Sequence, residues 1–241
     1  MIDLHCHILP GLDDGAATWQ DALEMARKAA EGGTRILAAT SHGDFSRGDP
    51  EEYLEQYRKT LARFRQELAE RNIPLKLAGG MELLVHEKLL RYGREHRLPS
   101  LNGGKYLLVE FWFDASSRRI REGLEELARM GWKLVLAHPE RYDAVRRHPE
   151  LLAELDRRGV VLQVNQGSLR GDFGRRARAL AEYMLRQEIA GALASDAHDP
   201  ILRSPDLDEI SRLLELRYGP GAAAYLLRDN PWRILCSVES L

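Results

Sequence analysis

Nine candidate metal ligands, chosen by their positions, are spread along this sequence, and they are of three types: histidine, aspartate and glutamate. Two of the histidines, His5 and His7, form an H-x-H pair near the N-terminus. Asp196 and His198 repeat that spacing almost two hundred residues later. Imidazole and carboxylate ligands together suit Zn, Mn or Fe. The candidate ligands are His5, His7, Asp14, His42, Glu82, Glu110, His138, Asp196 and His198.

The number and setting of these residues predict a centre with two or three ions. One ion takes about four to six ligands, and catalytic sites commonly take three of them from protein. Glu82 and Glu110 both lie in apolar runs, GGMELL and LLVEFW. Burying either carboxylate there without a cation would be costly. A lone histidine or carboxylate is more often a hydrogen-bonded structural residue, but nine such placements together favour a metal centre.

The elements that must position these ligands follow from the spacing of apolar residues. Short β-rich runs alternate with longer helical patterns. Strands are expected at residues 1–6, 34–40, 75–83 with an interruption at Gly79-Gly80, 106–112, 133–137, 160–165 and 189–194. Helices are expected at 19–31, 50–72, 85–92, 118–130, 149–158 and 175–186, with two or three more to the end. Thr18 and Pro50 are typical of helix starts.

Seven such units in a row imply a parallel sheet, and their number favours a distorted (β/α)7 TIM-like barrel in a single domain, residues 1–241. The candidate ligands fall where strands end. The third expected strand ends at Glu82, the fourth at Glu110 and the fifth is followed by His138. Because the carboxyl ends of parallel barrel strands lie on one face, we expect all nine side chains to converge there.

Composition narrows the function further. A net charge of -2 and a pI of about 6.5 give no support for a nucleic-acid partner. The sequence has no apolar run approaching the ~18 residues of a membrane span and no signal-type start, so a cytoplasmic protein without membrane insertion is expected. Cys6 and Cys236 do not begin a C-x5-R phosphatase loop. Strand alternation turns Cys6 away from the neighbouring histidines, so we expect it to be a buried apolar residue.

The motifs around the candidate ligands resemble those of the polymerase-and-histidinol-phosphatase (PHP) superfamily. More narrowly, they resemble the bacterial manganese-dependent protein-tyrosine phosphatases of capsule and exopolysaccharide gene clusters. The resemblance covers essentially the whole chain. The D-D-G loop and H-P-E-R-Y favour this subfamily over the histidinol phosphatases. The matching segments are MIDLHCHILPGLDDGA at the start, TSH, GME, VEF, AHPERY, QVN, ASDAH and DNPWRI.

That resemblance implies a distorted barrel of seven βα units and three divalent metal ions, Mn being expected and Fe and Zn being compatible. The first ion would be held by His5, His7, Glu82 and Asp196. Glu82 would bridge to a second ion, also bound by Glu110 and His138. Asp14, His42 and His198 would hold the third. Arg141 and Arg203 match the family's phosphate-binding arginines.

The predicted reaction is phosphomonoester hydrolysis in which a hydroxide bridging two metals attacks phosphorus. The substrate expected from the resemblance is phosphotyrosine on the tail of a bacterial tyrosine kinase. Two alternatives stay open: a small-molecule phosphatase acting on histidinol phosphate or a nucleotide, and a metal-bound module without catalytic activity. The sequence does not predict an oligomeric state.

Overall fold

The computed structural model describes residues 1–46 and 48–237, and the strands within them all pair in parallel. They form two sheets, with strand orders β1-β2-β4 and β3-β5-β6-β7-β8-β9. The strands are β1 (Ile2–Cys6), β2 (Ile36–Ala39), β3 (His42–Gly43), β4 (Lys76–Gly79), β5 (Glu82–Leu84), β6 (Tyr106–Glu110), β7 (Lys133–Ala137), β8 (Val161–Asn165) and β9 (Ala190–Ala194).

Two breaks interrupt the strands. The second expected strand, residues 34–40, becomes β2 and is followed beyond its expected end by β3, and the third expected strand, residues 75–83, becomes β4 and β5. At the second break the Gly80 N–H donates to the Tyr57 hydroxyl at 2.8 Å instead of to a neighbouring strand. A Cβ atom at Gly80 would also lie 2.8 Å from Leu101 Cδ2, so the tight passage favours glycine. Glu82 therefore begins a strand, and the expectation that it ends one was wrong.

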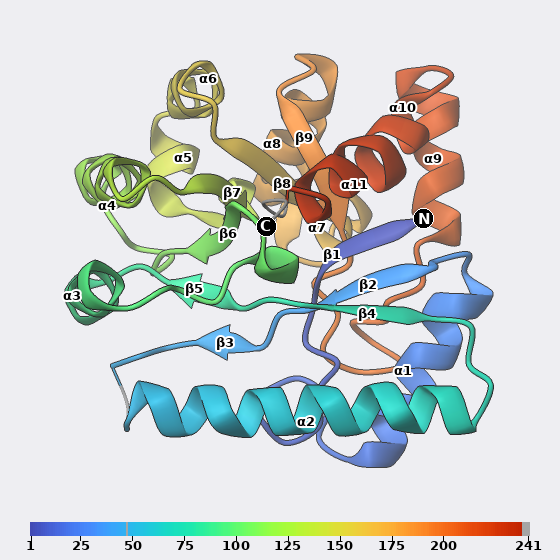
Figure 1. The fold of residues 1–241 in the computed structure, drawn as a ribbon. Helices are drawn as coiled ribbons and strands as arrows, with labels where there is room; N and C mark the ends of the chain where they lie inside the picture. The colour runs from blue at the N-terminus through green and yellow to red at the C-terminus, as the bar shows by residue number, and fades with distance from the viewer. Residues whose placement is uncertain (47, 238–241) are drawn as a thin grey trace.

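The first and last strands meet at their carboxyl ends. The Asp196 N–H donates to the His5 carbonyl at 2.8 Å, and the His7 N–H donates to the Ala197 carbonyl at 2.9 Å. These bonds place the chain after β9 beside the end of β1 (Figure 1). The strands between β1 and β9 are divided between the two sheets. The prediction of an α/β fold with a distorted TIM-like barrel is confirmed.

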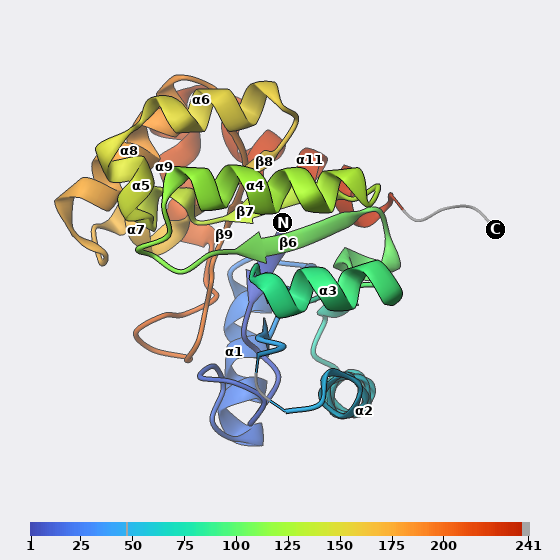
Figure 2. The ribbon, with the colours of Figure 1, turned by 90° about the vertical axis from the view of Figure 1, so that its left-hand side faces the viewer.

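Helices cover the outside of the strands (Figures 1 and 2). In both views α1 and α2 lie on one side of the molecule, and α4 and α6 lie on the other. The helices are α1 (Trp19–Glu31), α2 (Pro50–Glu70), α3 (Glu87–Glu95), α4 (Ser117–Arg129), α5 (Asp143–Arg147), α6 (Glu150–Arg157), α7 (Gln166–Arg170), α8 (Gly174–Arg186), α9 (Asp208–Tyr218), α10 (Ala222–Ala224) and α11 (Asn230–Leu235). Shorter helical turns are η1 (Leu101–Gly103), η2 (Pro139–Arg141) and the π-turn η3 (Tyr225–Asp229).

The predicted helix starts are confirmed where a capping residue was recognised. Thr18 and Asp21 form a reciprocal capping box on α1, and Asp49 caps α2 ahead of Pro50. The expected start of the next helix at 85 was wrong, because His86 accepts the Lys88 N–H and caps α3 instead. The short helices α5 and α7 were not predicted. Within the described part of the chain, every helix is too short or too polar to span a bilayer.

Alternating strand positions lead from the apolar core to the polar site. One core cluster gathers small and branched side chains from β1, β2, β4, β6, β7 and β9, with Ile234 and Leu235 of α11 packed against them. Leu108 belongs to this cluster, and Glu110 is two residues further along β6. On β6 the period of two residues therefore directs Glu110 to the same side as this core cluster.

Candidate metal centre

Glu82 lies at the centre of the site and contacts four histidines. Its Oε2 atom is 3.3 Å from Nε2 of His5, 3.3 Å from Nε2 of His7 and 3.1 Å from Nδ1 of His42. Its Oε1 atom is 2.8 Å from Nε2 of His138. The Glu82 side chain is only 1% exposed. These contacts join strands that are far apart in the sequence around one buried carboxylate.

The two histidines of the H-x-H pair show what the site is built to hold. Nε2 of His5 and Nε2 of His7 are 3.1 Å apart. The other nitrogen of each ring faces an acceptor: Gln163 Oε1 at 3.0 Å for His5 and Asp13 Oδ2 at 2.8 Å for His7. If each Nδ1 carries the proton, both Nε2 lone pairs face one another. A cation bound by both nitrogens would remove the repulsion between these lone pairs, so the donor set fits a metal ion.

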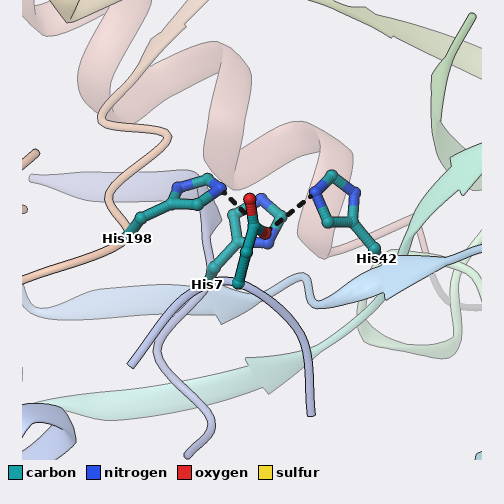
Figure 3. Close-up of side chains that lie close together, drawn as sticks. His7, His42 and His198 are labelled. Atoms are coloured by element: carbon teal, nitrogen blue, oxygen red, sulfur yellow. Dashed lines mark ion pairs between the residues drawn. The ribbon is translucent and has the colours of Figure 1, made fainter. Parts of the chain in front are cut away.

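A second group of side chains extends from the buried His7 to the solvent-facing edge of the site. His7, His42 and His198 converge there from three different segments (Figure 3). Asp14 Oδ1 lies between them, 3.3 Å from Nε2 of His42 and 3.5 Å from Nε2 of His198. The Asp14 side chain is 69% exposed, in contrast to buried Glu82. This end of the site is accessible from outside.

Two of the candidate ligands have an unusual backbone conformation. His138 has φ 34° and Asp196 has φ 49°, in the left-handed region that non-glycine residues seldom adopt. Each follows the end of a strand, β7 or β9, and each turns its side chain toward the centre of the barrel end, where it reaches His5 or Glu82. Strain of this kind is typical of functional sites, where the surrounding structure holds it in place.

All nine candidate ligands belong to compact groups whose ligand atoms lie within 4.8 Å of one another. One group joins His7 to the ligands expected for the third ion, and another contains His5, His7 and Asp196. His138 groups with His5 and Glu82, whereas Glu110 groups with His42 and Glu82. His138 and Glu110 thus share Glu82 but occupy different groups. The groups are His7–Asp14–His42–His198, His5–His7–Asp196, His5–Glu82–His138 and His42–Glu82–Glu110.

The pKa values of these groups show that the carboxylates and imidazoles compensate each other. Burial alone lowers the pKa of His7, but its hydrogen bonds to Asp13 and Glu82 outweigh burial and raise the pKa to about 9. Burial raises the pKa of Glu82, yet the histidines around it hold that pKa well below its usual range. Burial and the charge of Glu82 raise the pKa of Glu110. Because metal ligands must be unprotonated, ions entering this site would displace protons from the imidazoles.

The two arginines singled out in the sequence lie side by side at the same carboxylate. Arg141 Nη1 is 3.2 Å from Asp196 Oδ2, and Arg203 Nη2 is 2.7 Å from the same oxygen. Arg203 Nη2 also donates to the Asp196 backbone carbonyl at 2.9 Å. Asp196 Oδ1, on the other side of that carboxylate, lies 3.5 Å from both His5 and His7. The forked donors of both arginines are therefore next to the ligand cluster.

Three residues that support the ligands were not assigned a role from the sequence. Asp13 and Gln163 accept hydrogen bonds from the His7 and His5 rings, and Asn165 donates to Asp196 Oδ2. Gln163 and Asn165 occupy alternate positions of β8 and are both buried. Polar residues at period two inside an otherwise apolar strand were the available signal. Cys6 is buried, as expected, and lies outside the ligand groups.

A hollow of about 600 Å³ adjoins the exposed edge of the site. The candidate ligands Asp14, His42 and Glu110 form part of its wall. Trp112, which is 53% exposed, lines it as well. The hollow offers room for a group larger than phosphate beside the ligand cluster.

This geometry, a metal-ligand cluster beside two arginines, agrees with what comparison with known proteins finds. The model of a family described as "Capsular polysaccharide synthesis, CpsB/CapC" matches residues 1–236. The chain belongs to the CpsB/CapC family. The tyrosine-protein phosphatase YwqE of Bacillus subtilis is 34% identical to this CpsB/CapC chain over 230 residues, covering 95% of the chain and 89% of the relative. The tyrosine-protein phosphatase CpsB of Streptococcus pneumoniae is 29% identical over 243 residues, covering 98% of each.

A solved structure agrees with the whole fold of this CpsB/CapC chain. It superposes with a TM-score of 0.89 at 33% identity and covers 100% of this chain and 96% of the other. That structure comes from work on YwqE from Bacillus subtilis and CpsB from Streptococcus pneumoniae, described as metal-dependent tyrosine phosphatases. The similarity therefore extends from the family motifs to the complete arrangement of strands and helices.

Proposed function

We propose that this CpsB/CapC chain is a metal-dependent protein-tyrosine phosphatase. The observation that carries the proposal is the convergence of nine metal-capable side chains, Glu82 among them, in overlapping groups, with Arg141 and Arg203 on the carboxylate of Asp196. The names of its relatives support the same activity. The metal-bound module without catalytic activity is less well supported, because the ligand set and both arginines are complete.

We further propose three divalent ions, with Mn preferred over Fe and Zn. His5, His7, Glu82 and Asp196 are assigned to the first ion, Glu82, Glu110 and His138 to the second, and Asp14, His42 and His198 to the third. The burial of Glu82 and Asp196 supports the first assignment, since two buried carboxylates need nearby cationic charge. The contact of Asp14 with both His42 and His198 supports the third.

Different residues of the chain have different roles in phosphate-ester cleavage. Divalent ions bound here would supply Lewis-acid chemistry, acidifying water and offsetting the negative charge of phosphate. Arg141 and Arg203 bind phosphate oxygens through their forked N–H groups and stabilise the charge that accumulates on those oxygens. Gln163 and Asp13 hold the rings of His5 and His7 in one orientation. Precise orientation of these groups lowers the entropic part of the barrier.

The leaving group fits an aryl phosphate. Tyrosine phenolate has a conjugate-acid pKa of ~10, so it departs without a strong protein acid more readily than an alkoxide does. The exposed Asp14 edge and the hollow of about 600 Å³ leave space for a peptide on either side of the tyrosine. We propose the tyrosine-rich tail of a bacterial kinase, in the cytoplasm, as the substrate. An open edge favours this substrate over a histidinol phosphate or nucleotide, which would be enclosed.

The test is a comparison of substrates under defined metal loading. The protein is stripped with EDTA, reloaded with Mn²⁺, Fe²⁺ or Zn²⁺, and assayed on phosphotyrosine peptides, phosphoserine peptides, histidinol phosphate and nucleoside monophosphates. We expect fastest turnover of phosphotyrosine peptides with Mn²⁺. Fast turnover of a metabolite with none of the peptides would support the small-molecule alternative. Full metal occupancy without hydrolysis of any aryl phosphate would support the metal-bound module without catalytic activity.

A further inference from the structure

The guanidinium of Arg141 lies between two aromatic rings. Its Cζ atom is 4.5 Å from the ring centroid of Phe113 and 4.1 Å from that of Phe173. Phe113 comes from the loop after β6, and Phe173 from the loop between α7 and α8. The Phe173 ring centroid also lies 5.8 Å from Cζ of Arg203. One ring thus contacts both arginines, and the other contacts Arg141 alone.

This stacking matters because of how a guanidinium binds anions. Its N–H donors point outward in the plane of the group, whereas its two faces bind anions poorly and stack well on aromatic rings. Rings against the faces limit rotation of the plane and leave the donor edge free. Arg141 uses one edge nitrogen, Nη1, to contact Asp196 Oδ2 at 3.2 Å. With Cζ over both rings, the same edge faces Asp196 beside the ligand cluster.

Both rings are held in place by their own surroundings. A Cβ atom at Gly167 would lie 2.8 Å from Cε2 of Phe173, so glycine lets that ring pack directly on the α7 backbone. The Phe113 ring lies 5.8 Å from the His138 ring and 6.1 Å from the Tyr142 ring. Phe113 is nevertheless 44% exposed. Burial therefore does not account fully for a large apolar ring here, and contact with Arg141 gives it a role.

We propose that Phe113 and Phe173 are positioning residues that clamp Arg141 in the orientation needed to bind the phosphate group, with Phe173 steadying Arg203 as well. The inference rests on the proposed function, since it takes Arg141 to bind phosphate. The chemistry recognised through the clamp is the phosphate dianion. Neither ring is assigned any contact with the reacting atoms.

The experiment measures inorganic phosphate affinity by calorimetry and kcat/KM on p-nitrophenyl phosphate, both with Mn-loaded full-length protein. Phe173→Leu and Phe113→Leu remove the aromatic face at similar volume, and Phe173→Tyr keeps it. We expect each leucine variant to weaken phosphate binding and lower kcat/KM by roughly 3- to 30-fold, with unchanged metal content, and Phe173→Tyr to retain wild-type values. Tyr225→Leu, an exposed aromatic residue on η3, is the matched control.

A double-mutant cycle decides whether the rings act through Arg141. In an Arg141→Ala background, Phe113→Leu should not weaken phosphate binding or lower kcat/KM any further. Phe173→Leu should cause only the small loss of phosphate affinity that arises through Arg203. Equal losses with and without Arg141 would overturn the proposal, as would leucine variants that match wild type. The measurement of phosphate affinity distinguishes a failure of this inference from a failure of the proposed function. If the wild-type protein binds phosphate through Arg141 but does not hydrolyse esters, the proposed function is contradicted, and phosphate affinity in the variants still tests the clamp. If Phe173→Leu does not fold, Phe113→Leu provides the same cycle.

Discussion

Asp13 Oδ2 lies 2.8 Å from Nδ1 of His7, on the side of the ring opposite the nitrogen that faces Glu82. The same oxygen accepts the backbone N–H of His42 at 2.9 Å, and Asp13 Oδ1 accepts the Gly15 N–H at 2.9 Å. These bonds outweigh burial and lower the pKa of Asp13 to about 2. One carboxylate outside the ligand set thus orients two candidate ligands from different parts of the chain.

Asp13→Asn should weaken metal binding without removing a ligand. An amide has one acceptor oxygen where the carboxylate has two. Either the His7 ring and the His42 N–H or the Gly15 N–H would then face the amide NH₂. We expect metal affinity to fall about 10- to 100-fold, as for other residues that orient ligating histidines. Competition with a fluorescent chelator measures the change, with Asp156→Asn on the exposed side of α6 as control. Wild-type affinity in Asp13→Asn would show that His7 does not depend on this bond.

Glu82→Gln should have the largest effect on metal content of any single conservative change. The amide keeps the shape of the side chain but removes the negative charge that four histidines contact. We expect loss of at least one ion per chain by elemental analysis and a fall in kcat of at least about 100-fold, beyond the effect of a supporting residue. Glu122→Gln, on the exposed face of α4, is the control. Full metal content in Glu82→Gln would rule out its proposed bridging role.

Removing the metals should lower thermal stability. The site gathers buried carboxylates whose charge is compensated without ions by protonated imidazoles and, at Asp196, by Arg141 and Arg203. Binding to the folded state alone contributes about 2.7 kcal/mol when the ion is at one hundred times its Kd. For a chain of this size that corresponds to a rise in Tm on the order of 5 to 10 °C on adding Mn²⁺ to EDTA-treated protein. Scanning fluorimetry measures it, and an unchanged Tm with Mn²⁺ bound would contradict the expectation.

Arg141→Ala should slow turnover and leave the metals in place. The variant loses the forked donors next to Asp196 while every candidate ligand remains. We expect kcat/KM for phosphotyrosine peptides to fall about 10²- to 10³-fold, as when other oriented donors to a developing negative charge are removed. Arg146→Ala, on neighbouring α5 and paired with Asp143, is the matched control. If Arg141→Ala instead loses metal, the residue supports Asp196 and not phosphate.

Tyr57 should contribute stability that is lost at alkaline pH. Its hydroxyl donates to the Ala39 carbonyl at 2.8 Å and accepts the Gly80 N–H at 2.8 Å, and burial raises its pKa to about 12. An unfolded tyrosine ionises near a pKa of about 10. Between these two values the unfolded state binds fewer protons, so the free energy of unfolding decreases as pH rises.

Tyr57→Phe tests this sign directly. At pH near 8 we expect the free energy of unfolding to fall by about 1 to 3 kcal/mol, because Gly80 N–H and the Ala39 carbonyl lose their partner. The difference from wild type should then shrink as pH rises from about 10 to about 12. Urea unfolding at several pH values measures it, with exposed Tyr225→Phe as control. A difference that stays constant with pH would contradict the raised pKa.

Local patterns were sufficient to predict most of the strands and longer helices and to single out the candidate ligands. Strand periodicity and the D-x-H and H-x-H spacings depend only on neighbouring residues, as do the Thr18 and Asp49 caps. Broken strands were harder to predict. The halves of 75–83 separate because Gly80 bonds to the distant Tyr57 hydroxyl, and the sequence around Gly79-Gly80 shows a break without showing which sheet each half joins.

The nine candidate ligands were singled out by residue type and spacing in the sequence alone, because most of them lie near the end of a recognisable strand and parallel strands end on one face. Arg141 and Arg203 were singled out by the resemblance to the family. Only the tertiary structure decided how these ligands group around Glu82 and which residues orient them. Asp13 and Gln163 contact ligands, and Phe113 and Phe173 contact Arg141, mostly across segments far apart in the chain. Apart from the alternating polar residues of β8, such contacts leave no local pattern, since they arise from the packing of the barrel end and not from the period of any one strand or helix.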